Sequence, residues 1–412
     1  MSTGPASITL DELDRQGQIV VMGADTAAAL AATRLVEVRP VADGRWSLLP
    51  RGYVGAVRVD DFQVQVTPKE KVGLGRLLFL LGYARDPGFR PEDVSGTEEP
   101  DLWPALAESV VRLAESALAA GVLQGYSTVD ESLRTVRGRI RMGDQIARRP
   151  GLTVPLEVTY DEFTTDIAEN RILRTALRRI LAVPQLSARA RAALVHLDGR
   201  LDGAGLVRPG EQLPPWSRTR LNERYQPALR LAELVLRNTS AEAGPGGVRV
   251  AAFVVPMWQV FEDFVGTAIA ESLRRYPGRT QTSPQFVCCL DEAQPGHERD
   301  AITMSLDAVH LVHGVPRLIF DAKYKAENPH GRYPNADHYQ MLAYCTALSV
   351  PVAWLVYAQG SRSQTARAIK NTMISIVEYS LDLSAEPRNL LRQVDELARR
   401  AWNEMERTAD RD

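Results

Sequence analysis

The amino-acid sequence predicts an α/β fold for the last part of the chain, a mixed sheet flanked by helices, and an α+β fold for the part before it. Helical and strand patterns alternate in the last part, with helices at residues 257–276 and 336–348 and strands at residues 285–290, 302–310, 317–323 and 352–358. A helix, an antiparallel meander, a second helix and a further strand are typical of the α/β class. Earlier in the chain, alternating runs come first and Ala-rich helical patterns follow.

The first 101 residues are expected to form a β-rich domain. Residues 54–59 and 62–66 alternate in polarity on either side of Asp60 and Asp61, which predicts a hairpin. The segment LGRLLFLLGYA that follows has the spacing of a buried helix, and a polar loop is expected at residues 85–101.

Residues 102–243 are expected to form a mainly helical region whose arginines make it a candidate for binding a partner. Helical patterns cover residues 102–124, 165–183, 187–201 and 225–237, and a strand pattern covers residues 152–163. Between the first helix and this strand lies a stretch with six arginines: Arg134, Arg137, Arg139, Arg141, Arg148 and Arg149. Such a stretch is either a solvated face or a contact for a partner or DNA. The sequence Gly-Pro-Gly-Gly at residues 244–247 cannot continue a helix, so it marks the start of the last domain, residues 244–412.

The composition is that of an ordinary globular protein. The 412 residues are 45% apolar and 24% charged, which excludes disordered and fibrous classes. The formal net charge is −2, so any contact with nucleic acid must come from local patches or from a partner. Cys288, Cys289 and Cys345 form no metal or disulfide pattern and are expected to be reduced core residues. No apolar run approaches the roughly 20 residues of a membrane span, so we expect a cytoplasmic protein without membrane contact.

Two acidic residues in the last domain are placed unusually for a core sheet. Asp307 lies inside an alternating run, and Asp321 ends the next strand, after a turn that contains Gly314 and Pro316. Pairing of the two strands as a hairpin brings both carboxylates together, where they suit Mg²⁺, an ion that prefers oxygen ligands. Lys323 shares a strand face with Asp321 and can stabilise a phosphate transition state. The pattern is that of metal-assisted phosphodiester hydrolysis.

Three more residues fit this hypothesis. Glu262 lies beside the buried stripe of the helix before the sheet, from which it can reach the metal. Gln340 and Tyr344 are four residues apart, one above the other on the helix after Asp321. Each also has a structural interpretation. Glu262 can be a solvated helix residue, Gln340 a backbone bridge and Tyr344 a core residue, and His310 and His313 lie on opposite strand faces, which disfavours a metal pair there.

Asp307 and the DAK of residues 321–323 resemble the motif of PD-(D/E)xK nucleases, and Gln340 with Tyr344 resembles the Q-x-x-x-Y element of their RecB-like branch. More narrowly, the chain resembles the McrC family, the nuclease subunits of McrBC-type restriction systems that depend on 5-methylcytosine. The similar segments are VFEDFV, IFDAKYK and ADHYQMLAY in the last domain and YVGAVRV, FQVQVTPK, VRGRIRM, YDEFTTDIAENRILRTAL and NERYQPAL before it. One departure is Leu306, where the nuclease pattern usually has proline before the first aspartate.

The resemblance implies a restriction-endonuclease-like fold for residues 244–412 and cleavage of methylated DNA with Mg²⁺, for which Mn²⁺ can substitute. It implies Asp307, Asp321 and Glu262 as metal ligands, Lys323 as a catalytic residue, and Gln340 and Tyr344 as residues that position the site. It also implies a partner, the hexameric AAA+ GTPase McrB, whose ring receives the N-terminal half and whose GTP hydrolysis is stimulated. The chain itself is expected to bind no nucleotide, because no Gly-Lys-Ser/Thr follows its Gly-rich segment at Gly73. Two other functions stay open at this point, a non-cleaving adaptor of the AAA+ protein and a stand-alone RecB-like nuclease.

Overall fold

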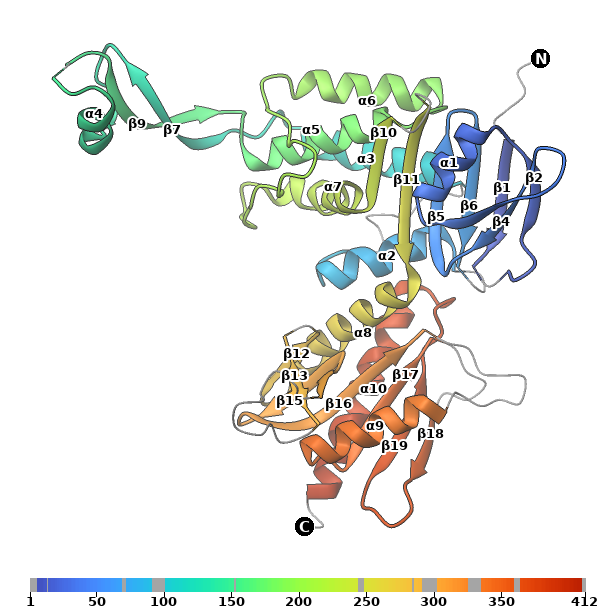
Figure 1. Ribbon diagram of the computed structural model, residues 1–412. Coiled ribbons are helices and arrows are strands. Elements are labelled where there is room, and N and C mark those ends of the chain that lie inside the picture. Colours follow the sequence, from blue (N-terminus) through green and yellow to red (C-terminus); the bar gives the residue numbers. More distant parts are fainter. Residues whose placement is uncertain are drawn as a thin grey trace. The chain divides into compact units, whose positions relative to one another are not determined.

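The computed structural model describes residues 6–12, 14–68, 72–90, 101–151, 153–243, 248–283, 285–290, 302–324, 335–358 and 364–409. The chain forms two compact units (Figure 1). The first comprises Met1–Leu102, Ala243–Val248 and Ala252–Asp412, and the second comprises Trp103–Glu242 and Arg249–Ala251. The three domains expected from the sequence stay a prediction. The Gly-Pro-Gly-Gly segment and most of the loop expected at residues 85–101 lie outside the described residues.

The N-terminal part of the first unit is built from two small sheets. Its elements are β1 (Ala6–Asp11), β2 (Gln18–Val21), α1 (Ala24–Ala32), β3 (Val36–Pro40), β4 (Arg45–Pro50), β5 (Tyr53–Val59), β6 (Phe62–Thr67) and α2 (Leu74–Arg85). The predicted hairpin is confirmed, because β5 and β6 are antiparallel and Asp60 between them has φ of 46°. Strand β1 lies parallel to β6, and β2, β4 and β3 form a separate sheet.

Strand β11 (Arg249–Pro256) joins the first of these sheets beside β5 and leads directly into helix α8 (Met257–Leu273). The two strands approach closely at Gly55, which has φ of 136°. A Cβ atom there would lie 1.9 Å from the carbonyl oxygen of Phe253, so only glycine fits. The start of α8, which carries Glu262, is thereby fixed to the N-terminal sheet.

The second unit consists of helices and one long ribbon. Its elements run through α3 (Leu102–Leu118), β7 (Gly125–Leu133), β8 (Arg139–Ile140), α4 (Met142–Arg148), β9 (Leu156–Thr164), α5 (Ala168–Leu181), α6 (Ala188–Arg200), η2 (Glu223–Tyr225), α7 (Gln226–Asn238) and β10 (Thr239–Ala243). The antiparallel strands β7 and β9 extend away from the helices of this unit and carry β8 and α4 at their far end (Figure 1). We call residues 134–155 the ribbon tip. The tip is the arginine-rich stretch noted in the sequence.

The C-terminal part of the first unit is the predicted mixed sheet with helices on both faces. After α8 come β12 (Arg279–Thr282), β13 (Val287–Cys289), β14 (Thr303–Ser305), β15 (Ala308–Val312), β16 (Val315–Lys323), α9 (Asn335–Leu348), β17 (Val352–Tyr357), β18 (Gln364–Ala368), β19 (Ser375–Ser380) and α10 (Pro387–Ala409). The strand order is β12-β15-β16-β17-β19-β18, antiparallel from β15 to β16 and parallel from β16 through β17 to β19. Helix α9 covers one face, and α8 and α10 lie on the other (Figure 1).

Two sequence expectations need correction. The single strand predicted at residues 302–310 is two strands, because β14 pairs with β13 whereas β15 belongs to the main sheet. Leu306 and Asp307 lie at the break. Leu306, at the position where the nuclease pattern usually has proline, is fully buried in the core. All three cysteines are free, as expected, but only Cys345 is buried, and Cys289 is exposed on the short β13–β14 ribbon. None of the described helices has the length and apolar character of a membrane span.

Candidate active site

The candidate site is built by the hairpin of β15 and β16. His313 and Gly314 have φ of 52° and 82°, which makes a tight two-residue turn. A bulge between His310 and Leu311 then shifts the register by one residue, so that Ala308 pairs with Phe320. Residues 318–320 of β16 are buried, as expected for a strand covered by helices on both faces. The strand therefore carries Asp321 and Lys323 at its carboxyl end, the edge at which α/β sheets hold their ligands.

Asp307 lies just before β15 and opposite the end of β16. Its Oδ2 atom accepts a hydrogen bond from the backbone N–H of Ala322 at 2.6 Å. This carboxylate occupies the place of a strand carbonyl, which explains why the predicted strand breaks there. Burial raises the pKa of Asp307, although the Ala322 N–H and the charge of Lys323 act in the opposite direction.

Asp321 and Lys323 form a buried ion pair. Lys323 Nζ lies 2.5 Å from Asp321 Oδ2, and only 2% of the Asp321 side chain is exposed. Burial raises the pKa of Asp321 to about 7 even though Lys323 opposes the shift, and the negative charge of Asp307 adds to it. Burial lowers the pKa of Lys323, but the surrounding carboxylates outweigh burial and keep it above the ordinary value. The lysine therefore stays charged at neutral pH.

Glu262 reaches this group from α8. Burial, followed by the charges of Asp307 and Asp321, raises its pKa to about 7. The helix comes close because Gly266, one turn later, has no side chain, and a Cβ there would lie 3.0 Å from the carbonyl oxygen of Asp307. Glu262 is thus electrostatically linked to the pair of aspartates, and its role as a metal ligand stays a prediction.

Gln340 and Tyr344 meet on α9, as their spacing predicts. Gln340 Nε2 donates a hydrogen bond to the Tyr344 hydroxyl at 2.7 Å, and that hydroxyl donates to the carbonyl oxygen of Ser305 at 3.0 Å. Tyr344 is buried in the core between α9 and the sheet. Burial and the charge of Asp321 raise the pKa of Tyr344 to about 12, so it stays a neutral donor. Tyr344 fixes the segment before Asp307, and Gln340 remains exposed above it.

Two buried acidic residues of this domain were not predicted from the sequence, and one of them acts on the site. The negative charge of Asp337, at the start of α9, contributes to the raised pKa of Asp321. Glu378 on β19 accepts hydrogen bonds from Arg367 at 2.7 Å and pairs with His338 at 2.8 Å. A glutamate inside the apolar run SIVEYS is the sequence signal that could have identified Glu378.

The four groups Glu262, Asp307, Asp321 and Lys323 suit a divalent cation. When all four groups are ionised, three carboxylates and one lysine have a net charge of −2, which one Mg²⁺ or Mn²⁺ ion compensates. Asp321 Oδ2 faces Lys323 Nζ at 2.5 Å. Within the described ranges, no three histidine, cysteine or acidic side chains are arranged as a ready metal site. It is the residue types and their summed charge that fit Mg²⁺.

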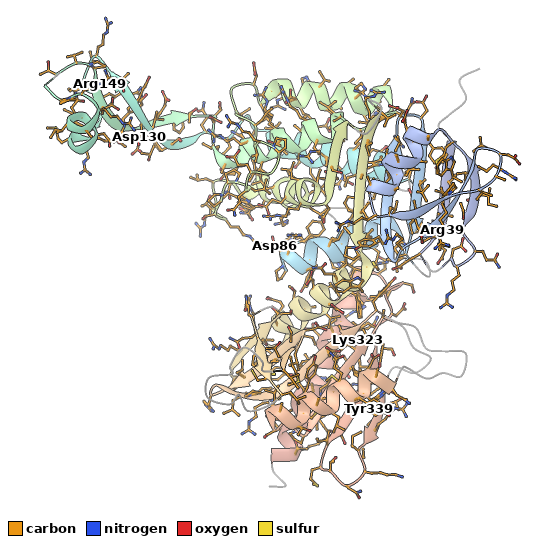
Figure 2. All side chains as sticks on the ribbon, in the orientation of Figure 1. Arg39, Asp86, Asp130, Arg149, Lys323 and Tyr339 are labelled. Carbon is orange, nitrogen blue, oxygen red and sulfur yellow. The ribbon has the colours of Figure 1, made fainter. Side chains whose placement is uncertain are left out.

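The ribbon tip shows what most of its arginines do. Arg141, Arg148 and Arg149 surround the buried carboxylate of Glu157 at 3.2 to 3.5 Å (Figure 2 labels Arg149). Hydrogen bonds from Ser132 and then Arg149 hold the pKa of Glu157 below its usual range. The ion pairs of these three arginines with Glu157 stabilise the folded tip. Arg137 stacks over the ring of Tyr160, while Arg134 and Arg139 are exposed and form no ion pair with the described residues.

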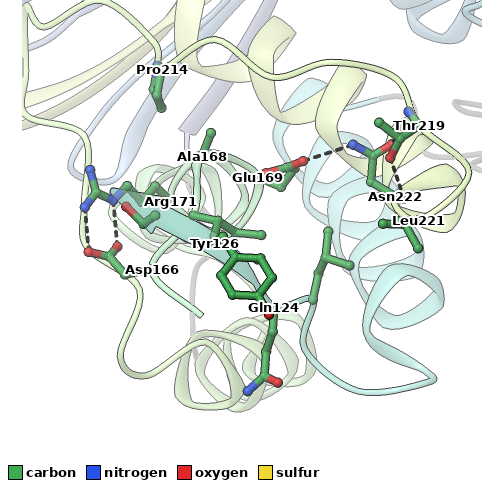
Figure 3. Close-up of a pocket in the computed structure, with 14 residues that line it drawn as sticks. Gln124, Tyr126, Asp166, Ala168, Glu169, Arg171, Pro214, Thr219, Leu221 and Asn222 are labelled. Carbon is green, nitrogen blue, oxygen red and sulfur yellow. Dashed lines mark hydrogen bonds and ion pairs between the residues drawn. The ribbon is translucent and has the colours of Figure 1, made fainter. Parts of the chain in front are cut away.

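The second unit contains a pocket of about 380 Å³ at the foot of the ribbon (Figure 3). Its charged residues are satisfied by each other, because Arg171 forms two hydrogen bonds with Asp166 and Glu169 accepts one from Asn222. It holds none of the predicted site residues. His310, in the first unit, is a buried core residue that contacts Thr280 and the carbonyl oxygen of Pro277.

A family of known proteins matches most of the chain. Residues 48–358 match the family model described as "McrBC 5-methylcytosine restriction system component", so the chain is a component of such a restriction system. The chain belongs to the McrBC family, and its resemblance to McrC is confirmed.

Two solved structures from Thermococcus gammatolerans are similar. A half-complex of McrB AAA+ hexamers with bound McrC has a TM-score of 0.57 at 17% identity over 97% of this chain and 100% of that chain. The second, a McrBC complex, has a TM-score of 0.40 at 20% identity over 66% of this chain and 90% of that chain. At these identities the first shows a shared fold. No curated protein matches the chain.

Proposed function

We propose that this chain is the Mg²⁺-dependent DNA endonuclease subunit of a McrBC-like restriction complex directed against modified DNA. The observation that carries the proposal is the convergence of Glu262, Asp307, Asp321 and Lys323 at one end of the β15–β16 hairpin. A PD-(D/E)xK nuclease requires these residue types together at such a strand end. The family membership, in a 5-methylcytosine restriction system, agrees with this chemistry.

Each side chain has a separate task in the proposed reaction. Asp307, Asp321 and Glu262 would hold the metal, which when bound activates water and stabilises charge on phosphate oxygens. Lys323 Nζ presents a positive charge beside the site and stabilises the negative charge that develops on the phosphate in the transition state. Tyr344, held by Gln340, fixes the chain segment that leads into Asp307.

The partner in this proposal is a McrB-like AAA+ protein, and the DNA substrate is methylated. The similar Thermococcus structure holds McrC bound to McrB AAA+ hexamers. The ribbon of the second unit is suited to such a partner, because its tip exposes Val136, Met142, Ile146 and Val154, each at least half exposed. A second candidate, an adaptor that stimulates the partner without cleaving DNA, rests on the same tip.

The test compares cleavage of methylated and unmethylated plasmid by the wild type and by Asp321→Asn, with Mg²⁺ or Mn²⁺, with and without the AAA+ partner and nucleotide. Because asparagine has the shape of aspartate but no charge, the variant should keep its fold and its partner and lose cleavage by at least 10²-fold. Asp25→Ala on the exposed face of α1 is the control and should cleave normally.

The outcomes separate the candidates. Cleavage only by the wild type with its partner supports the proposal, and cleavage by the wild type alone indicates a stand-alone nuclease. Stimulated nucleotide hydrolysis without cleavage under either metal leaves the adaptor. Full cleavage by Asp321→Asn would contradict the proposed site.

A further inference from the structure

A hydrogen bond joins the N-terminal sheet to the end of the strand that carries the candidate site. The hydroxyl of Tyr324 donates to Glu12 Oε2 at 3.1 Å, across 312 residues of sequence. Tyr324 directly follows Lys323, and Glu12 directly follows β1. Both residues belong to the first unit.

Glu12 is a rigid anchor. Only 6% of the residue is exposed, and its backbone N–H donates to the carbonyl oxygen of Thr67 at 3.0 Å, which continues the pairing of β1 with β6. A carboxylate in such a position moves with the whole N-terminal sheet.

Tyr324 lies between the two sides of the site. Its ring packs against that of Phe261, with centroids 6.1 Å apart, and Phe261 is the fully buried residue before Glu262. The carbonyl oxygen of Lys323 accepts a hydrogen bond from Ala358 at 3.3 Å and is the last backbone contact described for this end of β16. Beyond it, the side chain of Tyr324 is the next anchor of the strand.

We infer that Tyr324 is a positioning residue for Lys323 and Glu262, and that Glu12 holds it in place from the N-terminal sheet. This inference rests on the function proposed above. Lys323 Nζ must stay close to Asp321 Oδ2, which it faces at 2.5 Å, and a displacement of 1 Å in such a site can cost about 10²-fold in rate. By fixing the residue after Lys323, the hydrogen bond limits fraying of the strand end. The N-terminal sheet thereby sets the geometry of a site to which it contributes no catalytic residue.

The test uses the full chain with Tyr324→Phe, Glu12→Leu, the double variant and Glu12→Gln. Tyr324→Phe keeps the ring against Phe261 and removes only the hydroxyl, so it should fold even if Glu12→Leu does not. The control is Tyr339→Phe, since Tyr339 is 69% exposed on α9 (labelled in Figure 2). Two quantities are measured: kcat and KM for partner-dependent plasmid cleavage, and amide hydrogen exchange of a peptide spanning residues 318–324.

Tyr324→Phe and Glu12→Leu should each lower kcat by about five- to tenfold without changing KM for DNA, and should speed exchange in the peptide. The double variant should lose as much kcat as each single variant, because each single variant already removes the hydrogen bond between the two residues. Glu12→Gln should restore near-normal values, since its amide oxygen still accepts the bond. A purely structural role would not produce rescue of kcat at constant KM.

Additive losses, an effect of Glu12→Gln equal to that of Glu12→Leu, or unchanged kcat and exchange would overturn the inference. Absence of cleavage by the wild type would instead refute the proposed function, and hydrogen exchange then decides alone. Faster exchange in Tyr324→Phe supports the anchoring role, and unchanged exchange rejects it.

Discussion

At the scale of single residues, burial of the charged Asp321 side chain costs the folded protein free energy. Its side chain is almost fully buried, and burial outweighs the attraction of Lys323 and raises its pKa to about 7. A group in this state binds a proton more tightly when folded than when unfolded. It therefore weakens the metal-free protein wherever it is forced to ionise, which is the usual conflict between stability and function at an active site.

We predict that Asp321→Asn stabilises the metal-free protein at pH 8, by up to roughly 4 kcal/mol, since folding raises the pKa from 3.8 to about 7 and one pKa unit is equivalent to about 1.4 kcal/mol. The pKa of the Asp321 carboxyl is 3.8 in the unfolded chain and about 7 in the folded protein. The wild type therefore loses stability as the pH rises through this window. The gain should vanish below about pH 4, where both states are protonated. Urea unfolding in EDTA at pH 4 and pH 8 measures both values.

Addition of Mg²⁺ provides the control for this prediction. Binding to the folded state alone should raise the free energy of unfolding of the wild type and leave that of Asp321→Asn nearly unchanged. An Asp321→Asn advantage that grows as pH falls would show that the charge of Asp321 is not the cause.

The residues that the sequence could place are those set by strand alternation and turn chemistry. Asp321 and Lys323 follow an apolar run and share a face, and the turn at Gly314 brings Asp307 back towards them. The bulge between His310 and Leu311, which sets the final register, is not visible in the sequence pattern. Asp337 and Glu378 could not be placed either, because their positions depend on the order of strands and on how α9 packs. Whether these residues form a catalytic centre stays a prediction.

At the scale of elements, the ribbon tip is held by a charge cluster and has little apolar core. Glu157, on β9 just after the tip, is the common partner of three tip arginines. Helix α4 is seven residues long, too short to be stable without tertiary contacts. Three arginines of the tip therefore have a structural task. We propose that its exposed apolar residues and the two arginines without ion pairs to described residues, Arg134 and Arg139, contact the partner. The structure thus distinguishes ion-paired arginines from exposed ones, which the sequence pattern cannot do.

We predict that Glu157→Gln loosens the tip without unfolding the chain. Loss of the carboxylate leaves three arginines without their common partner, so amide exchange in α4 should rise while the thermal midpoint of the protein stays the same. Because the pKa of Glu157 is lowered by its partners, the wild-type tip should stay ordered above about pH 4.5 and loosen as pH falls further. Glu162→Gln, which breaks only an exposed contact with Arg137, is the matched control. Unchanged exchange in α4 would contradict the structural role of Glu157.

Some elements with a continuous apolar face were predicted, but β11, β19 and α10, which also bury apolar residues, were not. Strand β16 and helix α8 bury continuous apolar surface, which the pattern reveals. Strands β12 and β18 lie at the edges of the sheet and β7 lies in a two-stranded ribbon, so their polar residues face water on more sides and lack the alternation that marks a strand.

At the scale of the whole molecule, the two ends of the chain share the first unit. Phe79 and Tyr83 of α2 pack against Phe264 of α8, and Thr267 donates a hydrogen bond to the carbonyl oxygen of Ala84 at 2.8 Å. Contacts between residues nearly 200 apart leave no mark in local periodicity, so the sequence pattern cannot show that the two ends of the chain share one unit. The candidate catalytic site and the ribbon tip consequently belong to different units.

This separation leads to a prediction about the complete assembly. Replacing Val136, Met142, Ile146 and Val154 by serine should remove the apolar surface of the tip and with it the stimulation of nucleotide hydrolysis by the AAA+ partner. Ile19→Ser with Val21→Ser, on the exposed edge strand β2, is the matched control and should stimulate normally. Asp321→Asn should show the opposite defect, full stimulation without cleavage. Hydrolysis rates and plasmid cleavage measured on the same samples distinguish the two, and a tip variant that still stimulates hydrolysis would place the partner contact elsewhere on the chain.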